Sequence, residues 1–258
     1  ILLLHSSNDL YGASKIFLQL IDLFISKGFN VHVVLPDRGK LDDFLNKKDI
    51  TVSYHELGVL RKKYLNPMGL INRLITNLKA IKFLSNYINK LSIDLVYTNT
   101  STVLCGGIAA KRNNIPSLFH VHEIPTGNKF YESFSGKIIN KISNKVLTVS
   151  NSVKKHWLKY IDDKKIERIY NGIIFSKTDS LIKLERDQDD FVITSVARII
   201  PYKGHGYLID IANELIKKSS KFKFLIVGDT LSSYVSYEKS VKQKVKDLGL
   251  ENQIKFLG

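Results

Sequence analysis

Short apolar runs rich in β-branched residues alternate along the chain with longer segments in which apolar residues recur every three or four positions. Such runs are typical of buried strands, and such spacing is typical of helices that pack on a sheet. The predicted strands are Ile1–His5, Asn30–Leu35, Thr51–His55, Asp94–Thr98, Ser117–Val121 and Lys145–Val149. The predicted helices are Ala13–Ser26, Leu70–Lys90, Thr102–Arg112 and Ser152–Tyr160. This alternation predicts an α/β fold with a parallel sheet.

The alternation is interrupted at Phe175–Asp190, a polar segment without a sustained apolar period, which we interpret as an interdomain linker. Strands then resume at Phe191–Val196, Phe222–Val227 and Ile254–Leu257, with helices near His205–Lys218 and Val235–Leu248. We therefore predict two Rossmann-like domains, residues 1–174 and 191–258. Because doubly wound sheets usually have roughly five or six strands, we expect the second domain to continue beyond Gly258.

The chain has 39 basic and 24 acidic side chains, and its net charge of +15 favours an anionic partner. Nucleic acid is the weakest of these partners, because the sequence has no zinc-finger spacing and no aromatic RNA-binding strand. No stretch approaches the roughly 18 uninterrupted apolar residues of a membrane-spanning helix. Ile1–His5 has the character of a buried strand rather than a signal peptide, although no Met precedes it. A single cysteine, Cys105, excludes an intramolecular disulfide and indicates a small buried residue, so the cytoplasm is the expected compartment.

The turn after the strand Phe191–Val196 contains two cations, Arg198 and Lys203, just before Gly204 and a helix start. In an open α/β sheet, ligands bind beyond the carboxyl ends of the strands, where helix N-termini and loop cations attract anions. Arginine with its forked donors and lysine as a compact charge would suit a diphosphate. An ordinary solvated loop would contain the same residues, and the residues alone leave both interpretations open.

Six segments in the right order resemble glycosyltransferase family 4. They are "FHVHEIP" at 119–125, "LTVSNSVKKHWL" at 147–158, "IYNGI" at 169–173, "SVARIIPYKGHGYLIDIANELIKK" at 195–218, and "FKFLIVGD" with "IKFLG" at 222–229 and 254–258. The resemblance implies a GT-B fold, in which two Rossmann-like domains face a cleft, and transfer of a sugar with retention of configuration. It also implies that Arg198, Lys203 and Gly204 hold the diphosphate of a nucleotide-sugar donor.

Two further positions follow from the resemblance. Gly12 takes the place of the second glycine in the family's loop between the first strand and helix, where a glycine lets the backbone approach phosphate or sugar. His122 takes the place of a histidine near the transferred sugar. Because His120 and His122 alternate along an extended segment, we expect their side chains to face opposite ways. A histidine that is only packed locally remains the alternative, and Glu123 would either assist or be solvated.

The segment from residue 61 through Arg73 to Leu84 combines cations with apolar residues. It fits either a peripheral contact with an anionic membrane, at the inner face of the cytoplasmic membrane, or a core helix with a solvated Lys face. The membrane interpretation would make a polyprenyl-linked acceptor natural.

Our working hypothesis is a retaining glycosyltransferase that moves a sugar to a hydroxyl of a glycan or lipid-linked acceptor in cell-surface polysaccharide synthesis, such as lipopolysaccharide or capsule. No cofactor and no metal are expected, since two cations would neutralise the leaving diphosphate and no Asp-x-Asp motif is present. The family's pair of Glu separated by seven residues is absent from the chain, so we expect these 258 residues alone to be inactive. The alternative is a non-catalytic GT-B-like subunit or binding module.

Overall fold

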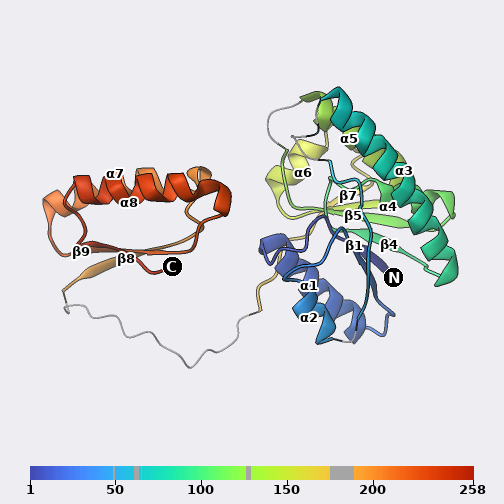
Figure 1. Ribbon diagram of the computed structural model, residues 1–258, viewed down its shortest axis with the longest axis horizontal. Helices are drawn as coiled ribbons and strands as arrows, with labels where there is room; N and C mark the ends of the chain where they lie inside the picture. The colour runs from blue at the N-terminus through green and yellow to red at the C-terminus, as the bar shows by residue number, and fades with distance from the viewer. Residues whose placement is uncertain (49, 61–63, 65, 126–128, 175–188) are drawn as a thin grey trace. The chain divides into compact units, whose positions relative to one another are not determined.

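The computed structural model describes all residues except 49, 61–63, 65, 126–128 and 175–188 (Figure 1). The chain divides into two compact units, Ile1–Phe175 and Ser176–Gly258, which are described separately. Phe175–Asp190, the predicted linker, lies almost wholly outside the described residues and stays a prediction.

Unit 1 is built on a seven-stranded parallel sheet with the order β3-β2-β1-β4-β5-β6-β7. Its strands are β1 Leu2–Leu4, β2 His32–Leu35, β3 Thr51–Tyr54, β4 Val96–Thr98, β5 Ser117–Val121, β6 Lys145–Thr148 and β7 Ile166–Arg168. Its helices are α1 Gly12–Ser26, α2 Asp42–Asn46, α3 Pro67–Lys90, α4 Cys105–Arg112, α5 Lys129–Ile142 and α6 Asn151–Trp157. The predicted α/β class with a parallel sheet is confirmed.

The alternation of side chains along β1 places apolar residues on both faces of the sheet. Leu2 and Leu4 are fully buried in a core with α3 and α4, whereas Leu3 is fully buried in a second core with α1. In α4, a Cβ on Gly106 would lie 2.2 Å from Leu4 Cδ1, so glycine is what allows this helix to lie so close to the sheet. Cys105 beside it is buried, as predicted.

Three elements of unit 1 were not predicted. The pattern of α2 and β7 is too short to show a period, and α5 has Ser135 and Gly136 in its middle, two residues that favour helices poorly. The packing explains the glycine, because a Cβ on Gly136 would lie 2.6 Å from Tyr160 Cβ. Tertiary packing therefore outweighs local preference in α5.

Unit 2 has a three-stranded parallel sheet with the order β10-β9-β8. The elements are β8 Phe191–Val196, the 3₁₀ turn η2 Pro201–Lys203, α7 His205–Lys218, β9 Phe222–Val227, η3 Ser232–Tyr234, α8 Val235–Asp247 and β10 Ile254–Phe256. Both helices cover the same face of the sheet, where they share a core with β9 and β10 (Figure 1). In the described part of the chain, no helix is long and apolar enough to cross a membrane.

Candidate functional site

His122 lies immediately after β5, at the carboxyl edge of the unit 1 sheet, and is half-buried. The expectation that His120 and His122 face opposite ways is wrong, since their ring centroids are 4.2 Å apart. The strict alternation of a strand ends with Val121. Beyond it the backbone turns, and the His122 amide donates to the Glu123 carboxylate over 3.2 Å.

Asn99 holds the His122 ring. Its Nδ2 lies 3.2 Å from the carbonyl oxygen of Ala13 in the first turn of α1, and its Oδ1 lies 2.9 Å from His122 Nε2. Because a carbonyl oxygen only accepts hydrogen bonds, the Asn99 nitrogen must face Ala13. Asn99 Oδ1 must then accept a hydrogen bond from His122 Nε2–H. Among the residues that the structure describes, this assignment leaves His122 Nδ1 as the ring nitrogen that is available to a ligand.

The same amide reaches a second histidine. Asn99 Nδ2 lies 3.2 Å from His5 Nδ1, and His5 Nε2 lies 3.0 Å from Ser14 Oγ in α1. His5 Nδ1 therefore accepts, and its Nε2 donates to Ser14. The start of α1 is tied to His122 by a chain of hydrogen bonds, all within unit 1.

Burial keeps this group of imidazoles neutral. Burial, with a smaller contribution from the neighbouring His122, lowers the pKa of His5 to about 4 and that of His120 to about 3. Burial also lowers the pKa of His122, while Glu123 opposes that shift. Tyr97 OH lies 2.6 Å from His120 Nδ1, and burial raises the pKa of this tyrosine, so the hydroxyl donates to the ring. The hydrogen-bond directions assigned around Asn99 are consistent with neutral imidazoles, and the one to His5 Nδ1 requires a neutral ring.

Glu123 is neither solvated nor directed at open space. Its Oε1 accepts from the Ser101 backbone amide (2.9 Å), from Ser101 Oγ (2.6 Å) and from Thr100 Oγ1 (3.1 Å). Its carbonyl oxygen accepts from Trp157 Nε1 over 3.1 Å. The residue fastens the turns after β4 and β5 to each other and to α6, and so supports the backbone that carries His122.

Gly12 is the first residue of α1 and is exposed. A Cβ placed on it would meet nothing within 4 Å, so packing among the described residues gives no reason for glycine here. The predicted reason, close approach of a ligand to the helix N-terminus, stays a prediction.

In unit 2, the predicted diphosphate residues share the loop between β8 and α7. Arg198 is half-buried and is followed by Ile199 and Ile200, which are only 2% and 6% exposed. The Ala197 amide donates to Val227 O (3.0 Å), the Ile199 amide donates to Asp229 O (3.1 Å), and Thr230 Oγ1 donates to Ile199 O (2.8 Å). Backbone bonds on both sides of Arg198 thus fix where its side chain emerges.

Gly228 permits this arrangement. Its φ of 142° is one that other residues rarely adopt, and a Cβ on it would lie 2.2 Å from Ala197 O. The loop ends with the exposed Lys203 and with Gly204, whose φ of 77° redirects the chain into α7. Lys203 consequently stands one residue before a helix N-terminus, where backbone N–H groups favour an anion.

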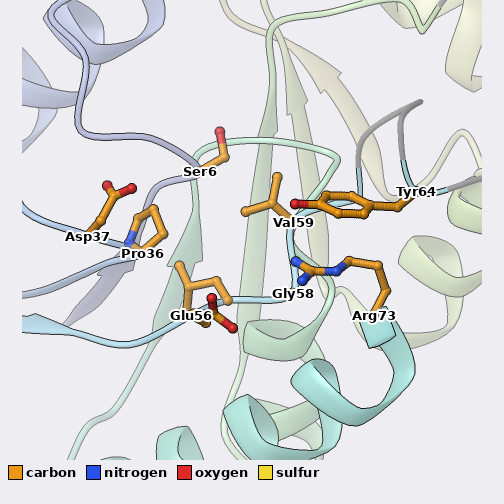
Figure 2. A pocket seen from close by; sticks show the side chains of 9 residues that line it. Ser6, Pro36, Asp37, Glu56, Gly58, Val59, Tyr64 and Arg73 are labelled. Atoms are coloured by element: carbon orange, nitrogen blue, oxygen red, sulfur yellow. The ribbon is translucent and has the colours of Figure 1, made fainter. Parts of the chain in front are cut away.

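A polar pocket of about 190 Å³ opens at the carboxyl ends of β1, β2 and β3 (Figure 2). Ser6, Asp37 and Glu56 follow these three strands in turn and line it. Arg73 of α3 lines the opposite side, with its guanidinium 4.1 Å from the centroid of the Tyr64 ring. In Figure 2 the guanidinium lies below this ring and points into the pocket, across from Asp37.

Sequence reasoning missed Asn99, His5 and Gly228, and it missed Ser6, Asp37 and Glu56 of the polar pocket. A signal existed for Asn99, because the polar run Asn99–Ser101 directly follows a buried strand. No comparable signal exists for Gly228, whose need for glycine depends on Ala197, a residue of another strand end. Asn99 links His122 to Ala13, the residue that follows Gly12, and Arg198, Lys203 and Gly204 lie in one loop.

Comparisons with known proteins match both units of the chain to glycosyltransferase sequence profiles. The sequence profile of "Glycosyltransferase Family 4" matches residues 11–177, and that of "Glycosyl transferases group 1" matches residues 176–258. An Escherichia coli relative, "UDP-Gal:alpha-D-GlcNAc-diphosphoundecaprenol alpha-1,3-galactosyltransferase", is 25% identical over 95% of this chain and 67% of its own length. A Staphylococcus aureus "capsular polysaccharide biosynthesis glycosyltransferase" is 26% identical, over 91% of this chain and 62% of its own.

Among solved structures, the Anabaena protein HepE in complex with UDP has a TM-score of 0.74 at 22% identity, covering 100% of this chain and 68% of that one. At this identity the likeness concerns the fold. The chain thus spans about two thirds of the length of several proteins that it matches.

Proposed function

The chain belongs to glycosyltransferase family 4, and from this membership we propose that the whole protein transfers a sugar from a nucleoside diphosphate donor to a hydroxyl group, with retention of configuration. The observation that carries the proposal is the loop of unit 2. It combines an arginine fixed by backbone bonds on both sides with a lysine at a helix N-terminus, an arrangement suited to a diphosphate. That the related HepE structure contains UDP supports the choice of donor.

In the proposed reaction, the bond between the anomeric carbon of the sugar and the diphosphate breaks, and the acceptor hydroxyl oxygen bonds to that carbon. Negative charge develops on the departing diphosphate, which takes up the hydroxyl proton. Arg198 and Lys203 stabilise this charge, taking the part that a metal ion plays in other transferases. His122 faces the sugar through Nδ1, because Asn99 occupies its Nε2. A fixed, neutral imidazole nitrogen there accepts a hydrogen bond from a sugar hydroxyl and orients the sugar for attack.

We further propose that the acceptor belongs to a cell-surface polysaccharide or to its lipid-linked precursor, and that transfer takes place at the inner face of the cytoplasmic membrane. The activities for which the Escherichia coli and Staphylococcus aureus relatives are named support this choice. So does the surplus of basic side chains, which favours an anionic lipid or diphosphate partner.

Arg198→Ala tests the proposal. Transfer is measured with the complete product of the gene, a panel of nucleotide sugars and polyprenyl-linked acceptors. The variant is expected to lower kcat by roughly 100-fold or more, because one charge-stabilising contact in a closed site is worth that much, while KM for the acceptor stays within a factor of about two. Chelation of divalent metals is expected to leave the rate unchanged.

Lys217→Ala is the matched control, since this exposed lysine forms a surface pair with Glu214 at the other end of α7. It should keep the parental rate. An Arg198→Ala protein as active as the parent would disprove the role of the loop. Absence of transfer by the parent with every donor and acceptor would favour the non-catalytic subunit instead.

A further inference from the structure

An apolar groove of about 400 Å³ lies between α3 and α5, above α4, in unit 1. Its walls are Leu70, Leu74 and Leu78 of α3, Ile108 of α4, and Phe134 and Ile138 of α5. The helix α3 divides here into two parts. Beyond Thr76 it buries Ala80, Ile81, Leu84 and Ile88 in the core, whereas its first three turns leave large apolar side chains in water.

The exposure is unusual for such side chains. Leu74 is 62% exposed, Met68 on the same helix is 77% exposed, and Phe130 at the start of α5 is 80% exposed. Soluble surfaces carry scattered apolar residues, but a contiguous cluster around a groove indicates a binding surface. Of the two sequence interpretations, the core helix therefore describes the second half of α3, and the first half has the character of a contact surface.

The groove and the polar pocket share a wall. Arg73 lines both cavities. Asn77, which lines the groove, donates to Gly58 O in the pocket wall over 3.1 Å and to Arg73 O over 2.8 Å. A Cβ on Gly58 would lie 2.3 Å from the Asn77 side chain, so glycine at this position lets the two walls meet.

The charged side chains differ between the apolar groove and the polar pocket. Of the described residues that line the groove, only Arg73 and Arg112 are charged, and both are cations. The polar pocket on the other side of Arg73 offers Ser6, Asp37 and Glu56, the oxygen-bearing side chains that proteins use to bind sugar hydroxyls. The polar pocket and the apolar groove therefore lie on opposite sides of one cation, Arg73.

We propose that these two cavities form one site for an amphiphilic acceptor. The saccharide lies in the pocket of Ser6, Asp37 and Glu56, an anionic phosphate or diphosphate contacts Arg73, and the hydrocarbon chain lies in the groove between α3 and α5. The proposal rests on the proposed function, since it identifies the acceptor as a saccharide joined to a lipid through phosphate. An apolar helix from a protein partner would match the groove, but it would make no use of Arg73 and of the adjoining polar pocket for binding.

The test measures binding of three probes, kept below their critical micelle concentrations, to the chain carrying Arg198→Ala and Lys203→Ala. These changes remove the proposed donor contacts, so the outcome does not depend on transfer. Farnesyl diphosphate combines chain and anion, farnesol has the chain alone, and inorganic diphosphate has the anion alone. We expect farnesyl diphosphate to bind at least about tenfold more tightly than either of the others, because the groove and Arg73 both contribute to its binding.

Leu74→Glu is expected to weaken farnesyl diphosphate and farnesol alike by about tenfold or more, since it places a charge in the groove. Ile75→Glu is the matched control, because the neighbouring Ile75 is 49% exposed on the same helix but does not line the groove. This variant should change the affinity for neither probe by more than about twofold. Arg73→Gln should weaken farnesyl diphosphate but leave farnesol unchanged. Unchanged thermal unfolding midpoints would show that all three variants fold.

Equal losses for Leu74→Glu and Ile75→Glu would overturn the proposal and indicate general adsorption of α3 to lipid. Equal effects of Arg73→Gln on both probes, or no binding of farnesyl diphosphate by the parent, would overturn it as well. If transfer fails with every donor while the probe results hold, the proposed function is wrong and the amphiphile site stands.

Discussion

In unit 1, His122 is held by other side chains, whereas in unit 2, Arg198 is held by the backbone. Asn99 links His122 to His5 and to the first turn of α1, and every one of these residues is at least half-buried. Around Arg198, hydrogen bonds between backbone N–H and C=O groups of neighbouring strand ends fix the loop, and Gly228 lies where the two backbone segments come closest.

The two constructions respond to different changes. A side-chain network contains titratable groups and depends on the direction of each hydrogen bond, so pH and isosteric substitutions disturb it. A loop fixed by backbone bonds tolerates replacement of its outward side chains, but it fails where a Cβ has no room. The predictions below separate these two kinds of support.

The largest effect is expected from Gly228→Ala in unit 2. The added Cβ would lie 2.2 Å from Ala197 O, on a backbone whose φ of 142° already disfavours alanine. We expect a loss of about 4 kcal/mol of stability in unit 2 and loss of UDP binding, because the Ala197–Arg198 peptide must move. Denaturant unfolding and calorimetric titration with UDP measure the two effects.

Gly206→Ala serves as the control for Gly228→Ala. Gly206 lies in the first turn of α7, and a Cβ there would meet only Tyr237 OH, at 3.9 Å. Alanine should therefore stabilise the helix by up to about 1 kcal/mol. If both alanine variants had the same stability, close approach of the backbone at Gly228 would not be what fixes the loop.

Acidification is expected to destabilise unit 1 next most strongly. The pKa of His5 is lowered to about 4 and that of His120 to about 3, so the unfolded chain binds protons that the folded unit does not. The stability is fully present above the unfolded pKa of about 6.5 and is lost as the pH falls toward 4. For His5 alone the loss amounts to roughly 3 kcal/mol.

Unfolding free energies measured between pH 8 and pH 4 test this slope, which is about 1.4 kcal/mol per pH unit for each proton taken up. His5→Gln should flatten it by about one proton below pH 6. A parental slope of zero over this interval would contradict the neutral imidazole network.

The α/β class and the positions of most strands follow from the sequence because burial on both faces leaves a simple apolar run, as in Leu2–Leu4. Gly12, His122, Arg198, Lys203 and Gly204 were reached by resemblance, and the structure places them at strand ends and helix starts. The direction of the His122 ring could not be predicted, since it depends on Asn99, 23 residues away in sequence. The apolar groove was predicted only in part: the sequence indicated a contact surface as one of two interpretations of this segment, but the same helical period runs through the buried half and the exposed half of α3.

Asn99→Asp tests the hydrogen-bond network of Asn99, His5 and His122, and its expected loss of stability is smaller than that caused by acidification. The change keeps the shape but turns the nitrogen that faces Ala13 O and His5 Nδ1 into an acceptor. We expect a loss of about 2 kcal/mol at pH 8, from two acceptors facing each other. The new carboxylate should also raise the pKa of both His5 and His122, so that the loss shrinks as the pH falls toward 6.

Histidine NMR titrations and unfolding curves measure the effects of Asn99→Asp. Asn86→Asp, at an exposed position on α3, is the control and should change stability by less than about 0.5 kcal/mol. A loss for Asn99→Asp that is the same at pH 8 and pH 6 would show that Asn99 does not set the protonation of the two rings.

The smallest effect on stability is expected from Gly12→Ala, and it is the most informative about ligand approach. A Cβ at Gly12 meets nothing within 4 Å, and alanine favours a helix start over glycine, so unit 1 should gain up to about 1 kcal/mol. If the glycine is there for a ligand, the same variant of the complete gene product should lose about tenfold or more in kcat/KM, because the new methyl group stands between the helix amides and the donor. Stability and activity would then change in opposite directions. A variant that is both more stable and fully active would show that no ligand comes close to the start of α1, and would leave His122 as the proposed sugar contact of unit 1.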